Sequence, residues 1–440
     1  MQRRQILKAI PLFLATWASS AYAQNLNNDA IRLFDVAAAK HKRELEMLWK
    51  LRSAPRIHIS KASSASIANI LSVQDKSDDE ATYPNKTSVL FYSYNVGKLH
   101  VWLLDEYGIQ AYHNQSISKQ QISEAISSLR NSLNINFFQR SLTPRQKTDV
   151  QNPTVKTQVR KSQKLAINEL TQILLPTPIA NKLDIVEHLI VVPILDIGTV
   201  PYAILKPFKN DYFLIDRMSI SIAPSLFDVG QALVKTSIAS LSLSPLIVGN
   251  PFLPESDDWS VPLLPGAAQE AKSVAKLMNA VPLLGKKATK TEILSKVEKS
   301  SFLYFATHGV ANSHNPLLGG FLMLSAKKLQ EGWWTAQEIQ NTHLKAEMAV
   351  LSACQTGLGQ THDAGIIGLS RAFQIAGVPR VVMSLWSVDD QATSALMQAF
   401  MKHLETQFPS EALRRAMLEI RQDYSKPLEW ASFVMFGTPR

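Results

Sequence analysis

Cysteine is almost absent from this chain, because its 440 residues contain only one, Cys354. An internal disulfide needs two thiols, so the sequence excludes one. A free thiol is open to oxidation in an oxidising compartment, and its presence there needs a reason. Two interpretations follow from the residue alone: a buried, inert thiol or a reactive one.

Long hydrophobic runs are also missing. After residue 23 no segment approaches the ~18 uninterrupted apolar residues of a transmembrane helix, so we expect no stable membrane span in the mature chain. Residues 1–23 have a cationic start, a short apolar stretch over residues 9–17 and an Ala-x-Ala end at Ala23. This pattern predicts a Sec-type signal peptide cleaved after Ala23, and a periplasmic or secreted protein. The alternative is a buried N-terminal helix.

Motifs for metals and nucleotides are missing as well. The histidines that surround Cys354 lack the paired short spacings of zinc ligands, and they are His308, His314, His343 and His362. Gly357 and Gly359 belong neither to a Gly-x-Gly-x-x-Gly motif nor to a P-loop. We therefore predict no metal and no cofactor.

The positive charge is partly local. The chain carries a formal net charge of +10, and residues 140–164 hold a cluster of lysines and arginines facing a single aspartate, Asp149. We interpret this segment as a solvated loop, with an anionic-surface contact or a processing site as alternatives. Nucleic acid is not expected as a partner of an exported chain.

The order of the predicted elements indicates an α/β fold with more than one core-forming unit. Helical spacing predicts an amphipathic helix over residues 28–51, and residues 53–85 form a predicted connector. A predicted meander follows, with strands over residues 88–94, 98–104 and 109–113. From residue 245 onward strands alternate with helices, which predicts a mostly parallel sheet with helices on both faces.

Short apolar runs predict further elements between these regions. Four of them are taken as strands, over residues 188–193, 203–205, 212–215 and 219–222. A helix is predicted over residues 365–376, after the strand-like run over residues 348–351. No internal repeat is found at a fixed period.

Cys354 and His308 each follow a buried, strand-like run, over residues 348–351 and 302–306. Open α/β sheets place their active sites at the carboxyl ends of such strands. The histidine lies 46 residues before the cysteine, close to the ~50-residue spacing of caspase-like cysteine proteases. We interpret Cys354 as a nucleophile and His308 as its base, against a buried structural thiol and a strand-end histidine. The backbone N–H groups of Gly309 and Cys354 are the candidate oxyanion hole.

Seven ordered motifs resemble those of the CHAT domain. They are Leu264-Pro265-Gly266-Ala267 with Glu270, Leu284-Gly285-Lys286-Lys287-Ala288-Thr289, Ala306-Thr307-His308-Gly309, Asn315-Pro316-Leu317-Leu318, Leu351-Ser352-Ala353-Cys354-Gln355-Thr356-Gly357-Leu358-Gly359, Leu385-Trp386-Ser387-Val388-Asp389-Asp390 and Trp430-Ala431-Ser432-Phe433. CHAT domains are caspase- and separase-related cysteine proteases of clan CD, often attached to tetratricopeptide repeats. The usual repeats are not found in this sequence, and the resemblance covers roughly residues 85–440.

The resemblance implies an organisation for the whole chain. Residues 85–240 correspond to a smaller, non-catalytic α/β region that is similar to an inactive protease, which we call the first half. Residues 241–440 correspond to a catalytic caspase-like domain with a mostly parallel sheet flanked by helices, which we call the second half. The signal peptide over residues 1–23 and a helix with its connector over residues 24–84 precede them.

The resemblance also implies a dyad of His308 and Cys354 that hydrolyses peptide bonds in a peptide or protein substrate. Separases have an acidic residue after a Leu-Trp motif that binds the side chain preceding the cut, and Asp390 or Asp389 corresponds to it. A basic side chain would then be preferred, whereas the alternative is that these aspartates only cap the next helix. Gln355 departs from the family pattern, in which glutamate is common.

The sequence leaves other functions open. A catalytically silent CHAT-fold binding or scaffold module, or another acyl-transfer hydrolase that uses the same dyad, would fit the same residues. A protein partner could bind through the helix over residues 28–51.

Overall fold

The computed structural model describes most of the chain. The described residues are 28–51, 63–72, 86–135, 143–144, 162–231, 244–256, 259–261, 264–310, 320–353, 360–362, 365–386 and 390–437. Several sequence predictions fall outside these ranges, namely the signal peptide over residues 1–23, most of the basic segment over residues 140–164, Cys354, Gln355 and Asp389.

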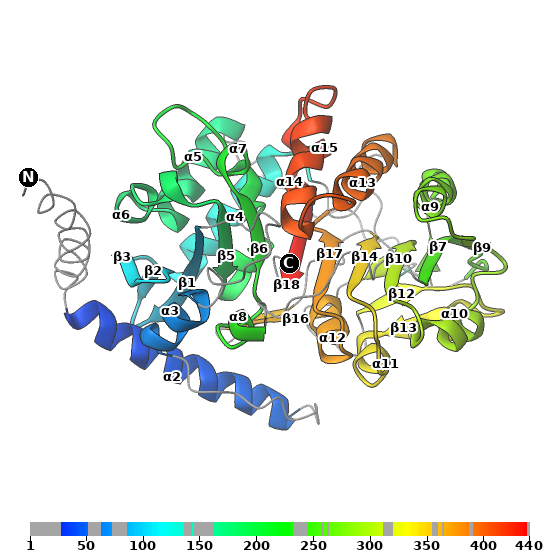
Figure 1. The fold of residues 1–440 in the computed structure, drawn as a ribbon, viewed down its shortest axis with the longest axis horizontal. Coiled ribbons are helices and arrows are strands. Elements are labelled where there is room, and N and C mark those ends of the chain that lie inside the picture. The colour runs from blue at the N-terminus through cyan, green and yellow to red at the C-terminus, as the bar shows by residue number, and fades with distance from the viewer. Residues whose placement is uncertain are drawn as a thin grey trace, which may run out of the picture.

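One eleven-stranded sheet runs through the described part of both halves (Figure 1). In spatial order its strands are β3 (Gly108–Ser116), β2 (Lys98–Asp105), β1 (Thr87–Asn95), β5 (His188–Val192), β6 (Ser219–Ile222), β18 (Phe433–Gly437), β17 (Arg380–Ser384), β14 (Met348–Ser352), β10 (Phe302–Ala306), β7 (Pro245–Pro251) and β9 (Leu283–Gly285). The predicted meander is confirmed as β1, β2 and β3, which pair antiparallel. The predicted α/β class with a mostly parallel sheet is confirmed.

The sheet changes direction once between its two parallel sections. Strands β1, β5, β6 and β18 are parallel to one another, and so are β17, β14, β10, β7 and β9. The two sections meet where β18 pairs antiparallel with β17. The carboxyl ends of β10, β14 and β17 therefore lie together at one edge of the sheet.

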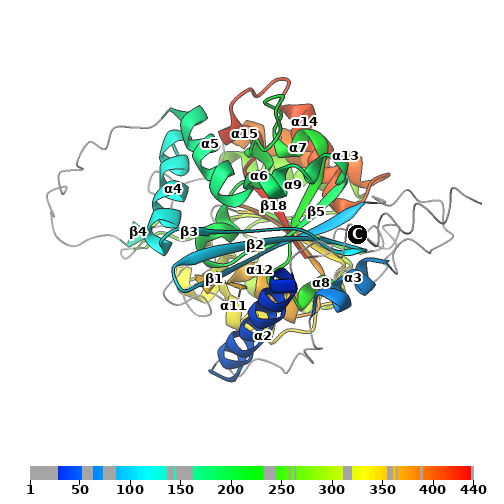
Figure 2. The same ribbon diagram turned by 90° about the vertical axis from the view of Figure 1, so that its left-hand side faces the viewer.

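Helices cover both faces of the sheet, as the two views show (Figures 1 and 2). One face carries α4 (Lys119–Ser132), α5 (Gln163–Leu174), α9 (Pro265–Leu277), α13 (Asp390–Leu404) and α14 (Pro409–Ile420). The opposite face carries α10 (Lys290–Val297), α11 (Ala336–Gln340) and α12 (Leu369–Ile375) under the second half. Strands β10 and β14 are nearly continuous apolar runs because both of their faces are covered.

The predicted N-terminal helix is confirmed as α2 (Asn28–Leu51). Its Phe34 packs edge-on against Phe91 and Trp102, and the Trp102 indole N–H donates to the Ala30 carbonyl at 3.1 Å. The helix is thereby fixed to the strands of the first half. Of the helices that the described ranges contain, none is long and apolar enough to cross a membrane.

The predicted connector over residues 53–85 is not irregular throughout. It contains α3 (Ser64–Ser72), whose Ile67 and Leu71 are buried against the same core as α2. These two residues are four apart and share one helix face, so a short amphipathic pattern lies within a segment rich in serine and alanine.

Two short predicted strands are wrong. Residues 203–205 lie in and beside a 3₁₀ helix (Tyr202–Ile204), and residues 212–215 run into the short helix α7 (Leu214–Arg217). The Asp216 carboxylate accepts a hydrogen bond from the Phe213 backbone N–H at 2.9 Å, which closes the first turn of α7. A short apolar run is compatible with either a buried strand or a buried helix, and local turn contacts decided in favour of helix here.

Two further elements differ from the sequence prediction. The helix predicted over residues 365–376 begins as a strand, β16 (Gly365–Ile367), which pairs with β15 (Gln360–His362), and α12 starts at Leu369. Strand β18, which joins the two halves of the sheet, was not predicted as a strand.

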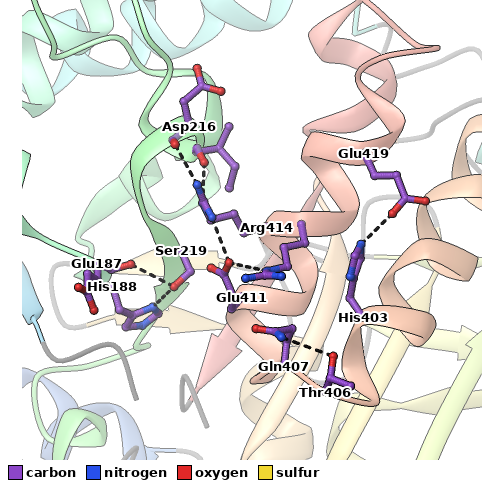
Figure 3. A network of polar contacts seen from close by, with 12 residues as sticks. Glu187, His188, Asp216, Ser219, His403, Thr406, Gln407, Glu411, Arg414 and Glu419 are labelled. Atoms are coloured by element: carbon purple, nitrogen blue, oxygen red, sulfur yellow. Dashed lines mark hydrogen bonds and ion pairs between the residues drawn. The ribbon is translucent and has the colours of Figure 1, made fainter. Parts of the chain in front are cut away.

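Charged contacts also join the halves. Arg414 of α14 donates to the carbonyls of Ile215 and Asp216, each at 2.8 Å, and to the Glu411 carboxylate (Figure 3). Arg371 of α12 pairs with Asp228 of α8 (Asp228–Gln231) at 2.6 Å. The two halves therefore share a sheet, a core, the Arg414 hydrogen bonds and one ion pair, Arg371–Asp228. The predicted boundary at residue 240 lies outside the described residues.

Candidate active site

His308 lies in a two-residue link between β10 and a second, smaller sheet. The link joins Ala306, the last residue of β10, to β11 (Gly309–Val310), which pairs with β12 (Phe321–Met323). The Thr307 hydroxyl donates to the Met323 carbonyl at 2.6 Å, and the Met323 N–H donates to the His308 carbonyl at 2.9 Å. Both residues of the link are thus attached to one strand, and His308 is only 4% exposed.

The pairing of β10 with β14 places the strand before His308 beside the strand that precedes Cys354 in the sequence. Ala306 lies opposite Ser352 in this parallel pair. His308 follows Ala306 by two residues, and Cys354 follows Ser352 by two residues. Neighbouring strands lie about 4.8 Å apart, so β10 and β14 end side by side at the edge of the sheet.

The residue before the cysteine is held by the next strand. The Ser384 hydroxyl, at the carboxyl end of β17, donates to the Ala353 carbonyl, and both residues are buried. Ala353 is the last described residue before Cys354. The position of Ala353 is therefore set by three neighbouring strands, β10, β14 and β17.

Gly309 presents its backbone N–H away from β12. It lies opposite Leu322, and the bond from the Met323 N–H to the His308 carbonyl makes Gly309 and Leu322 a non-hydrogen-bonded pair. In such a pair the N–H groups of both residues point away from the partner strand. The geometry leaves this N–H directed out of the small sheet, beside His308.

A small cavity of about 40 Å³ lies at the same edge of the large sheet. Its lining joins the strand ends to the beginnings of α9 and α13, and comprises Leu264, Ala267, Glu270, Thr307, Ser352, Ala353, Ser384, Trp386, Asp390, Thr393 and Phe433. The set contains two carboxyl groups, those of Glu270 and Asp390, and no lysine or arginine. We call this cavity the acidic pocket.

Asp390, a residue singled out from the sequence, lies in the acidic pocket at the start of α13. Its Oδ2 accepts a hydrogen bond from the Gly266 N–H at 3.0 Å, in the first turn of α9. A Cβ at Gly266 would lie 2.5 Å from the Asp390 Cβ, so the glycine permits this approach. The carboxylate therefore lies at the N-terminus of a helix other than its own, where the helix dipole favours an anion.

Glu270 is the pocket residue to which sequence reasoning gave no role. It belongs to α9, is 4% exposed, and its Oε1 accepts a hydrogen bond from the Tyr304 hydroxyl at 2.6 Å. Burial raises the pKa of Glu270 to about 7, although hydrogen bonds with Tyr304 and Ser352 act in the opposite direction. Its position between Ala267, Ala271 and Val274 on the apolar face of α9 is a signal visible in the sequence.

The family model of the CHAT domain matches residues 164–438, which is more than half of the chain. The chain belongs to the CHAT domain family. The match confirms the sequence resemblance, and it begins within the predicted first half.

This CHAT chain is also similar to part of a much longer animal protein. It is 26% identical over 282 residues to tetratricopeptide repeat protein 28 of Mus musculus and 27% identical over 283 residues to that of Homo sapiens. Each match covers 54% of this chain, but only 12% and 11% of the two relatives. The chain therefore spans a small fraction of the length of the curated relatives that it matches.

Among solved structures, the CHAT chain is similar to the separase chain of the Saccharomyces cerevisiae separase–securin complex. The TM-score is 0.50 at 12% sequence identity, and the match covers 97% of this chain and 35% of that one. The similarity confirms the predicted caspase-like α/β fold.

Proposed function

We propose that this CHAT chain is a cysteine endopeptidase that uses Cys354 as nucleophile and His308 as general base. His308 takes the thiol proton, and the thiolate attacks the carbonyl carbon of the scissile peptide bond. The imidazolium then donates that proton to the leaving amine, and the acyl group remains on Cys354. A water molecule, activated by His308, hydrolyses the thioester and restores the thiol.

The register of β10 and β14 is the observation that carries this proposal. Ala306 lies opposite Ser352 on the adjacent strand, and His308 and Cys354 each follow two residues later in the sequence. A general base must be within hydrogen-bond reach of the proton that it takes, or one water molecule away. The attachment of Thr307 and His308 to Met323, and of Ala353 to Ser384, supports a geometry that is fixed before substrate binds.

The oxyanion is proposed to bind to the backbone N–H groups of Gly309 and Cys354. Support comes from the Gly309 N–H, which points away from β12 beside His308. Preorganised N–H donors at the developing oxyanion are among the largest contributions to acyl-transfer catalysis.

The acidic pocket is proposed to bind the side chain that precedes the scissile bond. It is lined by Thr307 and Ala353, the neighbours of the two proposed catalytic residues, and it contains the Asp390 carboxylate. A cationic side chain would be favoured there by charge complementarity. Asp389 is retained as a second candidate for this role.

Export is a separate proposal that rests on the sequence of residues 1–23. If it is correct, the protein recovered from the periplasm or medium of an expressing cell begins at Gln24. Recovery in the cytoplasm with residues 1–23 intact would contradict it. Mass spectrometry of the intact protein distinguishes the two.

Peptide cleavage by matched variants tests the function. We expect the wild-type chain to cleave peptides with lysine or arginine before the scissile bond, and Cys354→Ala and His308→Ala to lose at least about 10³-fold in kcat/KM. His343→Ala is the control, because His343 is exposed and lies in the loop before β14, at the opposite end of that strand from Ser352. Cleavage that survives in Cys354→Ala would refute the mechanism.

The same assay separates the alternatives. Turnover of a simple ester or amide without peptide cleavage would indicate another acyl-transfer hydrolase with the same dyad. The absence of any turnover, together with binding of a protein partner that alkylation of Cys354 does not change, would indicate a scaffold module.

A further inference from the structure

Glu270 is a buried acid in the acidic pocket that the proposed mechanism does not use. Its carboxyl group contacts two hydroxyl groups, those of Tyr304 and Ser352. Among the described residues, no lysine, arginine or histidine forms an ion pair with it. The pocket thus contains an acid whose natural counterpart, a cation, is not supplied by the described part of the chain.

Among the described residues, the ionisable groups that face Glu270 come from two elements. Tyr304 extends from β10, and burial keeps its pKa well above the usual range, so it remains a neutral hydrogen-bond donor. Asp390 extends from α13, and its negative charge raises the pKa of Glu270. Strand β7 also packs against α9, but its residues include no ionisable side chain.

Burial makes the charged form of Glu270 costly when the pocket holds no cation. Two neighbouring carboxylates in a low-dielectric site repel each other, and one of them holds its proton more tightly. An opposite charge within about 4–6 Å reverses this effect and lowers a carboxyl pKa by roughly 1–3 units. Entry of a cationic side chain therefore changes the protonation state that Glu270 prefers.

We propose that Glu270 is a specificity-determining residue of the acidic pocket, which binds a cationic substrate side chain as a carboxylate and releases its proton to solvent as that side chain enters. The inference rests on the proposed function. In this step the neutral Glu270 carboxyl group and the substrate ammonium group form a carboxylate–ammonium pair, and one proton passes to water. Asp390, which is less buried than Glu270, supplies the other negative charge of the pocket.

Glu270 in this role favours a cationic substrate side chain over a neutral one. A neutral side chain of the same length gains nothing from ionisation of Glu270, whereas a lysine side chain does. The ratio of kcat/KM for a lysine peptide to that for its norleucine counterpart should therefore rise about tenfold between pH 6 and pH 8. Glu270→Gln keeps the shape and the acceptor for Tyr304 but cannot ionise, so the ratio should fall at least about tenfold at pH 8 and lose this rise.

Proton release upon binding provides a test that does not depend on turnover. The Cys354→Ala variant is titrated calorimetrically at pH 6.5 with the lysine peptide, in two buffers that differ in ionisation enthalpy. We expect release of about half to one proton per peptide bound, and almost none for the norleucine peptide or after Glu270→Gln is added. Glu270→Asp, which retains the acid, should still release a proton while binding more weakly. Glu292→Gln, an exposed change on α10, is the matched control and should not alter proton release.

The possible failures are distinguishable. Lysine-peptide binding without proton release, or an unchanged lysine preference in Glu270→Gln, would overturn the role of Glu270 while the peptidase proposal stands. Proton release on binding in a chain that cleaves no peptide would overturn the peptidase proposal and support the acidic pocket. If neither peptide binds, the role of Glu270 is overturned together with the proposed pocket specificity.

Discussion

Replacement of Glu270 by glutamine should stabilise the protein at alkaline pH. The pKa of Glu270 rises from 4.5 to about 7 on folding, mainly because the carboxyl group is buried. A group whose pKa is raised in the folded state contributes full stability below its unfolded pKa, and loses that contribution as the pH rises through its folded pKa. The wild-type chain should therefore lose stability relative to Glu270→Gln between about pH 4.5 and pH 7.

The size of this effect follows from the pKa shift. One pKa unit corresponds to about 1.4 kcal/mol, so a shift of about two and a half units corresponds to roughly 3 kcal/mol. Urea unfolding of both proteins at pH 5 and pH 8 measures the difference, with Glu292→Gln as the control for a charge removed at the surface. We expect a gain of at most about 1 kcal/mol for Glu270→Gln at pH 5 and of up to about 3 kcal/mol at pH 8. An equal difference at both pH values, or a less stable variant at pH 8, would refute the reasoning.

Three further changes test other contacts. Ser384→Ala removes the hydroxyl that donates to the Ala353 carbonyl, and should lower kcat about tenfold with little change in KM, whereas the exposed Ser295→Ala should not. Gly266→Ala would place two Cβ atoms 2.5 Å apart and displace Asp390, so KM for lysine peptides should rise severalfold more than KM for norleucine peptides. Arg371→Leu leaves Asp228, whose side chain is only 12% exposed, without this partner and should lower the free energy of unfolding by up to about 3 kcal/mol in urea, with much of the loss recovered when Asp228→Leu is added.

The sequence was sufficient to predict the features that depend on periodicity. The apolar runs of β10 and β14 indicated buried parallel strands, and the helical spacing of residues 28–51 gave the bounds of α2. His308 was placed at a strand end for the same reason, and the structure confirms that position.

Features that depend on tertiary contacts could not be predicted in this way. The runs at residues 203–205 and 212–215 are too short to carry a period, and turn contacts made them helical. The direction change at β18 depends on which strands meet, which spacing along the chain does not specify. The role of Asp390 at the N-terminus of α9 depends on a contact with Gly266, 124 residues away in sequence.

The environment of Glu270 could be predicted from the sequence only in part. Its place on the apolar face of α9 was visible in the sequence, and a glutamate there indicates a buried acid. The cavity and the neighbouring Tyr304 and Asp390, which give this acid a chemical context, came only from the fold.

Covalent labelling of the single thiol tests the central claim most directly. A peptidyl acyloxymethyl ketone with lysine next to its reactive group should alkylate the wild-type chain once, as the thiolate displaces the carboxylate leaving group. Because Cys354 is the only cysteine, loss of the added mass in Cys354→Ala assigns the label to that thiol. We expect rapid labelling of the wild-type chain, labelling at least about 100-fold slower in His308→Ala, and none in Cys354→Ala. Equal labelling rates with and without His308 would contradict the proposed dyad.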